Sequence, residues 1–223
     1  MGAQKFGMDQ GICKDVACAI ATLSNQGIQV GIVVGGGNIF RGFQGSLAGM
    51  ERIPADQIGM IGTMINGLTL QQAILSNGGK ARVLNALNCP GITESYQWEK
   101  AIDYLQNGEV VIMVGGTGLP YFSTDTAAAL RAVEIKADIL LKATKVDGVY
   151  DKDPVKHNDA KKFEKLTHQE MLQSRLAVMD APAAALCMDN KLPILVFDVF
   201  AEDSLKKAVF SQDIGTLIVP SQS

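Results

Sequence analysis

The sequence predicts an α/β protein, a three-layer α/β/α sandwich with a mainly parallel central sheet, built as a single domain over residues 1–223. Two observations carry this prediction. Short runs rich in Val and Ile alternate with longer runs whose apolar residues recur every three or four positions, and several of the short runs end in glycine. Strands that alternate with helices are joined by right-handed crossovers, which make neighbouring strands parallel.

In the first half of the chain, capping residues and glycines mark where elements begin and end. Asp9 is a typical N-cap and Gly27 a typical helix stop, so a helix is expected between them. Ile28–Val34 is a short run without strict alternation, which favours a strand buried on both faces. The elements expected in this half are helices over 8–26, 54–76 and 97–106 and strands over 28–34, 81–87 and 109–114.

The long helix over 54–76 carries Ile58, Ile61, Ile65 and Leu68 on one face. The second half of the chain continues the alternation, except for a charged stretch over 151–162 that has few apolar residues and is expected to form a mobile loop. The elements expected in this half are helices over 125–135, 167–173, 181–191 and 203–210 and strands over 138–142, 194–197 and 215–219.

Composition excludes several classes of function. Lys and Arg number 20 against 23 Asp and Glu, a net charge of −3, whereas a general nucleic-acid binder needs a basic face. No uninterrupted apolar run approaches the ~20 residues that cross a bilayer, so no membrane partner is expected. The 4 cysteines lack metal-ligand spacing and only 2 histidines are present, so we expect no protein metal site, a reducing cytoplasmic compartment, and Cys13 and Cys18 buried in the first helix.

Three turns that follow predicted strands contain glycine and polar residues, and ligands of open α/β sheets bind beyond the carboxyl ends of the strands. The first turn, Gly35–Gly37, is followed by Arg41. Glycine lets the backbone approach phosphate oxygens closely, and an arginine adds a charge-assisted bidentate contact. A tight turn without a ligand is the alternative for the glycines alone. With Arg41 close behind, anion binding is favoured.

The second turn, Gly115–Asp125, combines three glycines with hydroxyl groups and two aromatic rings that can lie against a base. Ser123 or Thr124 is also a candidate N-cap of the next helix, a role compatible with binding a ligand at that helix end. The third turn, Leu141–Pro154, begins with Lys142 at the end of a strand. Its acidic residues are solvated loop charges on composition alone.

Taken in order, these motifs resemble the bacterial uridylate kinases (UMP kinases) of the amino-acid-kinase fold family. The resemblance runs from Phe6 to Leu217. The motifs that carry it are GGGN-x-x-RG, ADQ-x-G-M, GTG-x-P-x-x-[ST]TD, KAT-x-VDGVY-x-x-DP and VMD. The GTG-x-P stretch is the most specific of them, because the others are shared with acetylglutamate and aspartate kinases.

The resemblance implies phosphoryl transfer from ATP to UMP in pyrimidine nucleotide biosynthesis, with Mg²⁺ as cofactor, and assigns roles to single residues. For UMP it implies Gly36, Asp56, Thr117, Gly118, Leu119, Pro120, Tyr121, Phe122, Ser123 and Thr124. For ATP it implies Gly37, Arg41, Thr144, Tyr150 and Asp153. The catalytic residues expected are Arg41, Lys142 and Asp180. Without the resemblance, Asp56 reads as a carboxylate that favours the start of its helix through the helix dipole.

The same resemblance implies a homohexamer that GTP activates and UTP inhibits. It also implies a strand ending in Lys-x-Ser-Gly-Glu ahead of the segment that matches Met1–Phe6, which would supply a catalytic lysine. We therefore expect the 223-residue chain to act poorly as an enzyme by itself. The alternatives to a UMP kinase are a catalytically impaired nucleotide-binding protein, if Met1 is the true start, and another small-molecule kinase of the same fold.

Overall fold

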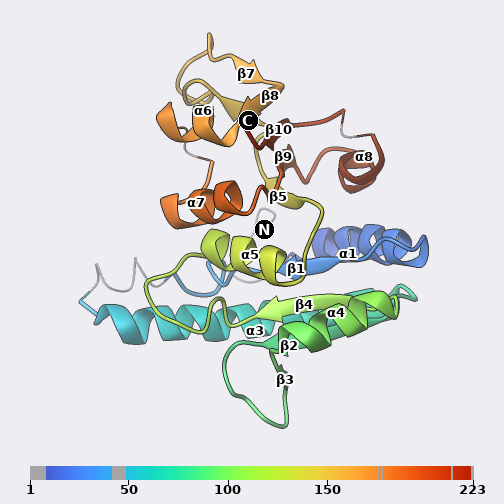
Figure 1. Ribbon diagram of the computed structural model, residues 1–223. Helices are drawn as coiled ribbons and strands as arrows, with labels where there is room; N and C mark the ends of the chain where they lie inside the picture. The colour runs from blue at the N-terminus through green and yellow to red at the C-terminus, as the bar shows by residue number, and fades with distance from the viewer. Residues whose placement is uncertain (1–8, 42–48, 175, 177, 212, 222–223) are drawn as a thin grey trace. The chain divides into compact units, whose positions relative to one another are not determined.

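The structure is a computed structural model that describes residues 9–41, 49–174, 176, 178–211 and 213–221 (Figure 1). The sequence motifs that include Met1–Phe6 and Gly42 therefore extend outside the described residues. The chain divides into two compact units, of which unit 1 ends at Arg131 and unit 2 begins at Ala132. Each unit contains a four-stranded sheet, so the predicted α/β class with mainly parallel strands is confirmed, with the strands distributed over two sheets.

Unit 1 is built on a sheet in which every pair of neighbouring strands is parallel, in the order β1-β4-β2-β3. All five residues of β4 are buried, because helices cover both of its faces. The elements of unit 1 are α1 (Gln10–Asn25), β1 (Gly31–Val33), α3 (Arg52–Ser76), β2 (Ala81–Asn85), β3 (Glu94–Ser95), α4 (Trp98–Gln106), β4 (Val110–Val114) and α5 (Thr124–Glu134), whose last turn extends into unit 2.

The first helix and strand agree in part with what their sequences predict. The carboxylate of Asp9 accepts hydrogen bonds from the backbone of Gly11 and Ile12, which confirms it as the N-cap of α1. Cys13 is buried as expected, but Cys18 is exposed, because it lies on the face of α1 turned away from the sheet. The strand β1 is shorter than expected and only partly buried, since β4 is the one strand paired with it among the described residues.

The long helix α3 packs against β2 and β4 (Figure 1). Gly67 lets the backbone of α3 come close to β4. A Cβ at Gly67 would lie 2.3 Å from a methyl carbon of Val114, so only glycine fits this contact. The face with Ile58, Ile61 and Ile65 points away from the sheet and is exposed. By length and composition α3 is apolar enough to cross a membrane. Of its apolar 18-residue stretch, 44% is buried inside the molecule.

Unit 2 contains a mixed sheet in the order β5-β9-β10-β8, in which only β9 and β10 run antiparallel to each other. Its core gathers around Leu195 and Phe197 of β9 and Ala208 of α8. The elements of unit 2 are β5 (Leu140–Thr144), β6 (Val149–Tyr150), β7 (Lys162–Phe163), β8 (Lys165–Thr167), α6 (His168–Gln173), α7 (Ala181–Asp189), β9 (Ile194–Asp198), α8 (Ser204–Phe210) and β10 (Thr216–Val219).

The stretch after β5, expected as a mobile loop, is enclosed by a small antiparallel pair of strands, β6 and β7. The carboxylate of Asp151 accepts a hydrogen bond from the backbone of Lys161, and Lys152 forms an ion pair with Asp159. Sequence reasoning missed this hairpin because each of its strands has only two residues.

Candidate nucleotide-binding site

One face of α3 carries three polar residues that organise the candidate site in unit 1. Asp56, Thr63 and Asn66 are separated by seven and three positions, so they lie along the same side of the helix. Thr63 and Asn66 are buried, and the Asp56 side chain is only 13% exposed. Buried polar groups need hydrogen-bond partners, and each of these residues finds one in a loop that follows a strand.

Asn66 holds the glycine turn that follows β1. Its side-chain nitrogen donates to the carbonyl oxygen of Gly35, and its amide group pairs with the side chain of Asn38 in both directions. Gly36 lies directly on α3, where a Cβ would come within 2.2 Å of the Gly59 carbonyl oxygen. The turn is therefore fixed against the helix in a position that only glycine allows.

Arg41 folds back over the same turn. Its Nε donates a hydrogen bond of 3.1 Å to the carbonyl oxygen of Gly37, and the contact is exposed. This places a guanidinium group beside the backbone of the glycine turn, as the sequence predicted. A fixed cation next to closely approachable backbone is the arrangement that binds phosphate oxygens.

The second turn, after β4, is anchored from two sides. The backbone N–H of Gly115 donates to Thr63 Oγ1 at 2.7 Å, in a fully buried contact. The carbonyl oxygen of Gly116 accepts a hydrogen bond of 3.2 Å from Arg131 of α5. Arg131 is 5% exposed, and its guanidinium stacks on the ring of Tyr96, 3.8 Å from the centroid. Neither Thr63 nor Arg131 was identified from the sequence.

Beyond these anchors the second turn presents large apolar side chains to solvent. Leu119, Tyr121 and Phe122 are all exposed, with Tyr121 at 62%. Tyr121 also has a left-handed backbone conformation, with φ of 73°, which is unusual for an aromatic residue. Exposed rings on a constrained turn are suited to lie against a flat base.

The turn ends at the start of α5, as the sequence predicted. The hydroxyl of Ser123 accepts a hydrogen bond from the backbone of Thr126, so Ser123 caps the helix. The Thr124 side chain lies beside Gly35, which brings the glycine turn and the second turn next to each other. The hydroxyl of Thr117 bonds the backbone of Leu119 and shapes the bend between them.

Asp56 connects the helix to the second turn. Its Oδ2 accepts a hydrogen bond from the backbone N–H of Tyr121 at 2.8 Å. The same oxygen accepts from Arg52 Nε at 2.7 Å. Unit 1 thus contains all the residues for which the resemblance implies UMP binding, namely Gly36, Asp56 and Thr117 to Thr124, together with Gly37 and Arg41.

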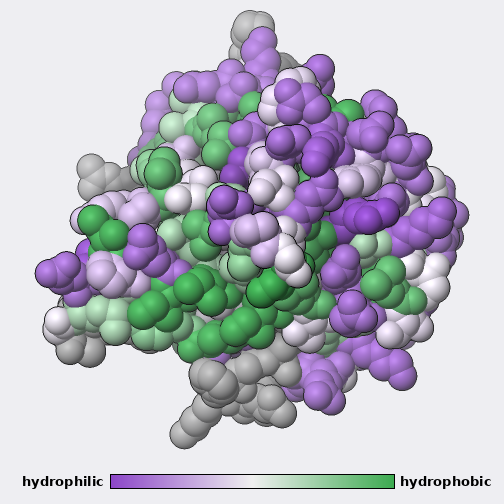
Figure 2. All heavy atoms as spheres, turned by 90° about the horizontal axis from the view of Figure 1, so that it is seen from below, coloured by the Kyte–Doolittle hydropathy of each residue, from purple (hydrophilic) through white to green (hydrophobic). Residues whose placement is uncertain are grey.

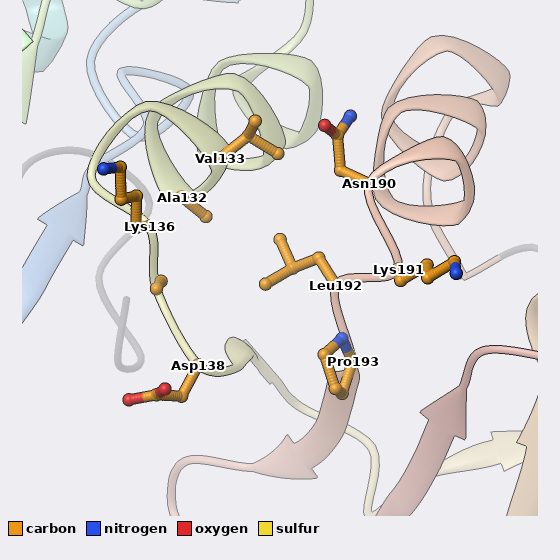
Figure 3. A pocket seen from close by; sticks show the side chains of 9 residues that line it. Ala132, Val133, Lys136, Asp138, Asn190, Lys191, Leu192 and Pro193 are labelled. Atoms are coloured by element: carbon orange, nitrogen blue, oxygen red, sulfur yellow. The ribbon is translucent and has the colours of Figure 1, made fainter.

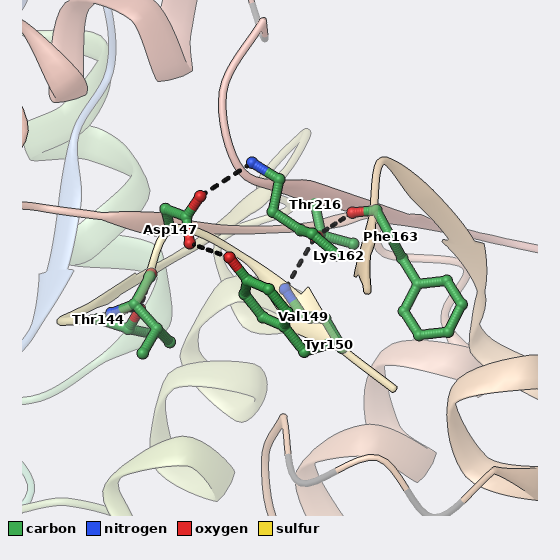
Figure 4. Close-up of polar contacts among 8 residues, drawn as sticks. Thr144, Asp147, Val149, Tyr150, Lys162, Phe163 and Thr216 are labelled. Carbon is green, nitrogen blue, oxygen red and sulfur yellow. Dashed lines mark hydrogen bonds and ion pairs between the residues drawn. The ribbon is translucent and has the colours of Figure 1, made fainter. Parts of the chain in front are cut away.

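Unit 2 holds the remaining predicted residues. Lys142 and Thr144 lie in the second half of β5, and the Thr144 hydroxyl accepts a hydrogen bond from the backbone of Val146. The Tyr150 hydroxyl donates to Asp147 at 2.7 Å, and Lys162 contacts the other oxygen of Asp147 at 3.1 Å (Figure 4). The Tyr150 hydrogen bond, followed by Lys162, lowers the pKa of Asp147 below its ordinary value.

Thr216 stabilises this turn from β10. Its hydroxyl accepts from the backbone of Val149 at 2.8 Å and donates to the carbonyl oxygen of Phe163 (Figure 4). Asp153 accepts a hydrogen bond from the backbone of Val155, which is the main cause of its lowered pKa. Asp180 is the N-cap residue of α7, and one of its carboxylate oxygens is buried.

A pocket elsewhere in unit 2 does not involve the predicted residues. It lies where α5 and α7 end, and Lys136 and Lys191 at these ends both have left-handed backbone conformations (Figure 3). Leu192 and Pro193 form part of its wall. Among the described residues, no group of three or more His, Cys, Asp or Glu side chains is placed to hold a metal ion.

Comparisons with known proteins agree with the motifs. A family model described as the amino acid kinase family matches residues 3–198. The chain is 50% identical to a uridylate kinase of Protochlamydia amoebophila over 98% of this chain and 88% of that protein. It is 47% identical to a uridylate kinase of Bacteroides thetaiotaomicron over 98% of this chain and 92% of that protein.

Solved structures give the same answer. The crystal structure of a UMP kinase from Bacillus anthracis matches with a TM-score of 0.95 and 33% sequence identity, and the match covers 99% of this chain and 91% of that one. The two uridylate kinases are similar in sequence over nearly the whole chain. The chain therefore belongs to the amino acid kinase family, and within it to the uridylate kinases.

Proposed function

We propose that this chain transfers the γ-phosphoryl group of ATP to UMP, giving ADP and UDP. The observation that carries the proposal is the contact between Asp56 and the second turn. Both donors to Asp56 use Oδ2, and none of the hydrogen bonds among the described residues uses Oδ1. A carboxylate oxygen with a fixed orientation at the edge of an apolar turn is suited to accept from the hydroxyl groups of a ribose.

The acceptor nucleotide then lies in unit 1. Tyr121 and Phe122 provide exposed rings for the uracil base, and Asp56 accepts from the ribose. Gly36 is the backbone contact nearest α3, where the 5′-phosphate would meet the N–H groups of the glycine turn. Thr117 to Thr124 complete this site.

For the donor nucleotide we propose Gly37 and Arg41 at the phosphates, and Thr144, Tyr150 and Asp153 at the adenine and ribose. The hydrogen bond between Tyr150 and Asp147 supports this role, because it fixes the ring orientation of Tyr150. The family model spans both units, which supports the proposal that they act as one amino-acid-kinase domain.

In the reaction, an oxygen of the UMP phosphate attacks the γ-phosphorus of ATP. The bond from that phosphorus to the bridging oxygen breaks, and ADP leaves with the electron pair. The attacking oxygen is already ionised, so no strong general base is required, and catalysis consists of positioning and charge stabilisation. Arg41 and Lys142 are the cations proposed to stabilise the transferred group, and Asp180 is proposed to orient a catalytic lysine.

Mg²⁺ is proposed to bind with ATP. It usually takes its ligands from the nucleotide phosphates and one or two carboxylates rather than from a protein cage. Asp180 fits this mode as a single carboxylate with one buried oxygen. When bound, the ion would supply further charge neutralisation at the phosphates.

We also propose a cytoplasmic homohexamer that responds to GTP and UTP. The exposed face of α3 supports the assembly, because no charged residue lies between Asp56 and Lys80. Figure 2 shows a band of hydrophobic side chains on the underside of the molecule. On α3, Ile61 and Ile65 are about half exposed (51% and 50%). An exposed apolar face of this kind is suited to pack against a second copy of the chain related by a two-fold axis. All four cysteines are free, which fits a reducing compartment.

The proposal is tested with two measurements on the 223-residue chain. Calorimetric titration should detect binding of UMP and of ATP, and a coupled assay should detect ADP formed only when UMP is added. The titration detects the acceptor site even when turnover is slow. Failure to bind UMP, or equal ADP formation with aspartate or acetylglutamate as acceptor, would contradict the proposal.

A further inference from the structure

Arg52, the first residue of α3, connects the two sides of the acceptor site. Its Nε donates to Asp56 Oδ2 at 2.7 Å, and its guanidinium carbon lies 5.2 Å from the centroid of the Tyr121 ring. The backbone of Tyr121 donates to the same Oδ2 at 2.8 Å. Each of the three residues thus contacts the other two, and we refer to Arg52, Asp56 and Tyr121 together as the clasp.

The clasp holds a strained residue. Tyr121 has φ of 73°, a conformation that an aromatic residue keeps only when its surroundings enforce it. The residue is 62% exposed, so packing in a core does not enforce the conformation. What restrains Tyr121 is the hydrogen bond from its N–H to Asp56 and the guanidinium over its ring.

The clasp also determines which atom of Asp56 faces a ligand. With two donors on Oδ2, rotation of the carboxylate would break two hydrogen bonds at once. Oδ1 is therefore held in one orientation, and it accepts no hydrogen bond from the part of the chain that the structure describes. A binding group that is ordered before the ligand arrives loses less conformational entropy on binding.

We propose that Arg52 is a positioning residue of the acceptor site, which orders Asp56 and Tyr121 and thereby determines affinity for UMP and preference for a ribose over a deoxyribose. The proposal rests on the proposed function, since it concerns the same site. Arg52 acts through Asp56, and the 2′-hydroxyl of the ribose is the group that the fixed Oδ1 recognises. A lysine would fill this role poorly, because it lacks a planar group that can bond a carboxylate and stack on an aromatic ring at the same time.

Unit 1 contains a matched control for this arrangement. Arg82 of β2 places its Nε 2.7 Å from Glu109 Oε2 and its guanidinium 5.1 Å from the centroid of the Tyr104 ring. The geometry is nearly that of Arg52, but neither Glu109 nor Tyr104 belongs to the turns of the site. Arg82→Gln therefore measures the general effect, on nucleotide binding, of losing an arginine that pairs with a carboxylate and lies over an aromatic ring.

The test measures dissociation constants for UMP, dUMP and ATP by calorimetry, using the full chain and the variants Arg52→Gln, Arg52→Lys and Arg82→Gln. Arg52→Gln should raise the dissociation constant for UMP about tenfold, the typical effect of losing a hydrogen bond to a charged group. It should also reduce the preference for UMP over dUMP and leave ATP within about twofold. Arg52→Lys should recover part of the UMP affinity, and Arg82→Gln should change none of the three constants.

A double-mutant cycle shows whether Arg52 acts through Asp56. In an Asp56→Asn background, Arg52→Gln should weaken UMP by less than about twofold, because the partner of Arg52 is already altered. Additive effects, equal weakening of UMP and ATP, or an unchanged UMP constant in Arg52→Gln would each overturn the proposal.

A second measurement needs no nucleotide and separates this proposal from the proposed function. Amide hydrogen exchange at Tyr121 should accelerate in Arg52→Gln and stay unchanged in Arg82→Gln, because only the first variant loosens the acceptor of the Tyr121 N–H. Unchanged exchange overturns the clasp while the UMP kinase assignment stands. Absence of UMP binding in the unaltered chain overturns the assignment itself and, with it, the role of Arg52.

Discussion

The backbone N–H of Tyr121 donates a hydrogen bond of 2.8 Å to the carboxylate of Asp56, although the two residues are 65 positions apart in the chain. The contact joins the start of α3 to the turn after β4. It is possible because α3 runs along β4, and Thr63 anchors the same turn two helical turns further on. The acceptor site is thus organised by one helix, whose opposite face is apolar and exposed.

The first prediction concerns Asp56. Asp56→Asn keeps an oxygen for the N–H of Tyr121 but removes the charge that pairs with Arg52, so UMP should bind more weakly by about 1–3 kcal/mol. ATP affinity should stay within about twofold, as judged by calorimetric titration of both nucleotides.

Asp153→Asn is the corresponding change on the proposed donor side. It should weaken the binding of ATP and leave the binding of UMP unaffected. The opposite pattern in the two variants would mean that the acceptor and donor sites are assigned the wrong way round.

The second prediction compares two neighbouring glycines. A Cβ at Gly36 would lie 2.2 Å from the Gly59 carbonyl oxygen and 3.0 Å from the Thr63 nitrogen, both of them backbone atoms that cannot move freely. A Cβ at Gly37 would meet only the flexible side chain of Arg41, at 3.5 Å. Gly36→Ala should therefore destabilise the fold by ~1–3 kcal/mol or more through overpacking.

Thermal unfolding tests the comparison directly. The Tm of Gly36→Ala should fall by at least about 3 °C, since 1 kcal/mol corresponds to roughly 2–4 °C in a chain of this size. Gly37→Ala should unfold within about 2 °C of the unaltered chain. Equal Tm values for the two variants would show that the close contact between Gly36 and α3 is absent in solution.

The third prediction concerns pH. His168, at the start of α6, is fully buried, and burial lowers its pKa, an effect that the backbone of Leu192 opposes in part. The folded chain therefore holds His168 neutral, while the unfolded chain binds a proton below pH ~6.5. Its contribution to stability is complete above that pH and is lost as the pH falls, with a slope of up to ~1.4 kcal/mol per pH unit.

Denaturant unfolding between pH 5 and pH 8 measures this slope. His168→Gln should flatten it, whereas His157→Gln should not, because His157 is exposed. A slope that persists in His168→Gln would assign the acid sensitivity to other groups.

The fourth prediction concerns assembly through α3. Ile61→Lys together with Ile65→Lys places two charges on the exposed apolar face, where they would be buried without partners in an interface between copies. Sedimentation should then show a species smaller than that of the unaltered chain.

Val155→Lys is the control for this change, because Val155 is also apolar and exposed but lies in the loop between β6 and β7. It should leave the sedimentation coefficient unchanged. Unaltered assembly in the α3 variant would exclude this face as an interface.

Features with local causes could be predicted from the sequence. The N-cap of α1 at Asp9 was predicted, and that of α5 was narrowed to Ser123 or Thr124, because a cap bonds backbone groups within three residues of itself; the structure selects Ser123. The glycine turn with Arg41 was predicted for the same reason, since Arg41 bonds Gly37 only four positions away. The resemblance added the UMP-binding roles of Asp56 and of the second turn by matching motifs, without indicating that they touch.

Features with distant causes could not be predicted. Thr63 and Asn66 read as ordinary polar residues in a helix until Gly115 and Gly35 are seen to bond them. Arg131 lies within a predicted helix, and only packing buries it against Tyr96. The strand β10 was predicted, but not that it pairs antiparallel with β9 and parallel with β8.

Local sequence patterns were enough to predict the α/β class, most of the elements and the three turns, and the motifs were enough to predict the kinase family. Each of these depends on residue type and on spacing within a few positions. The tertiary structure alone decided that the isoleucines of α3 face outwards while Asp56, Thr63 and Asn66 face the turns, because both faces of that helix contain apolar residues. The clasp also depends on the tertiary structure. A hydrogen bond between residues 65 positions apart forms only once the sheet has brought α3 beside the end of β4.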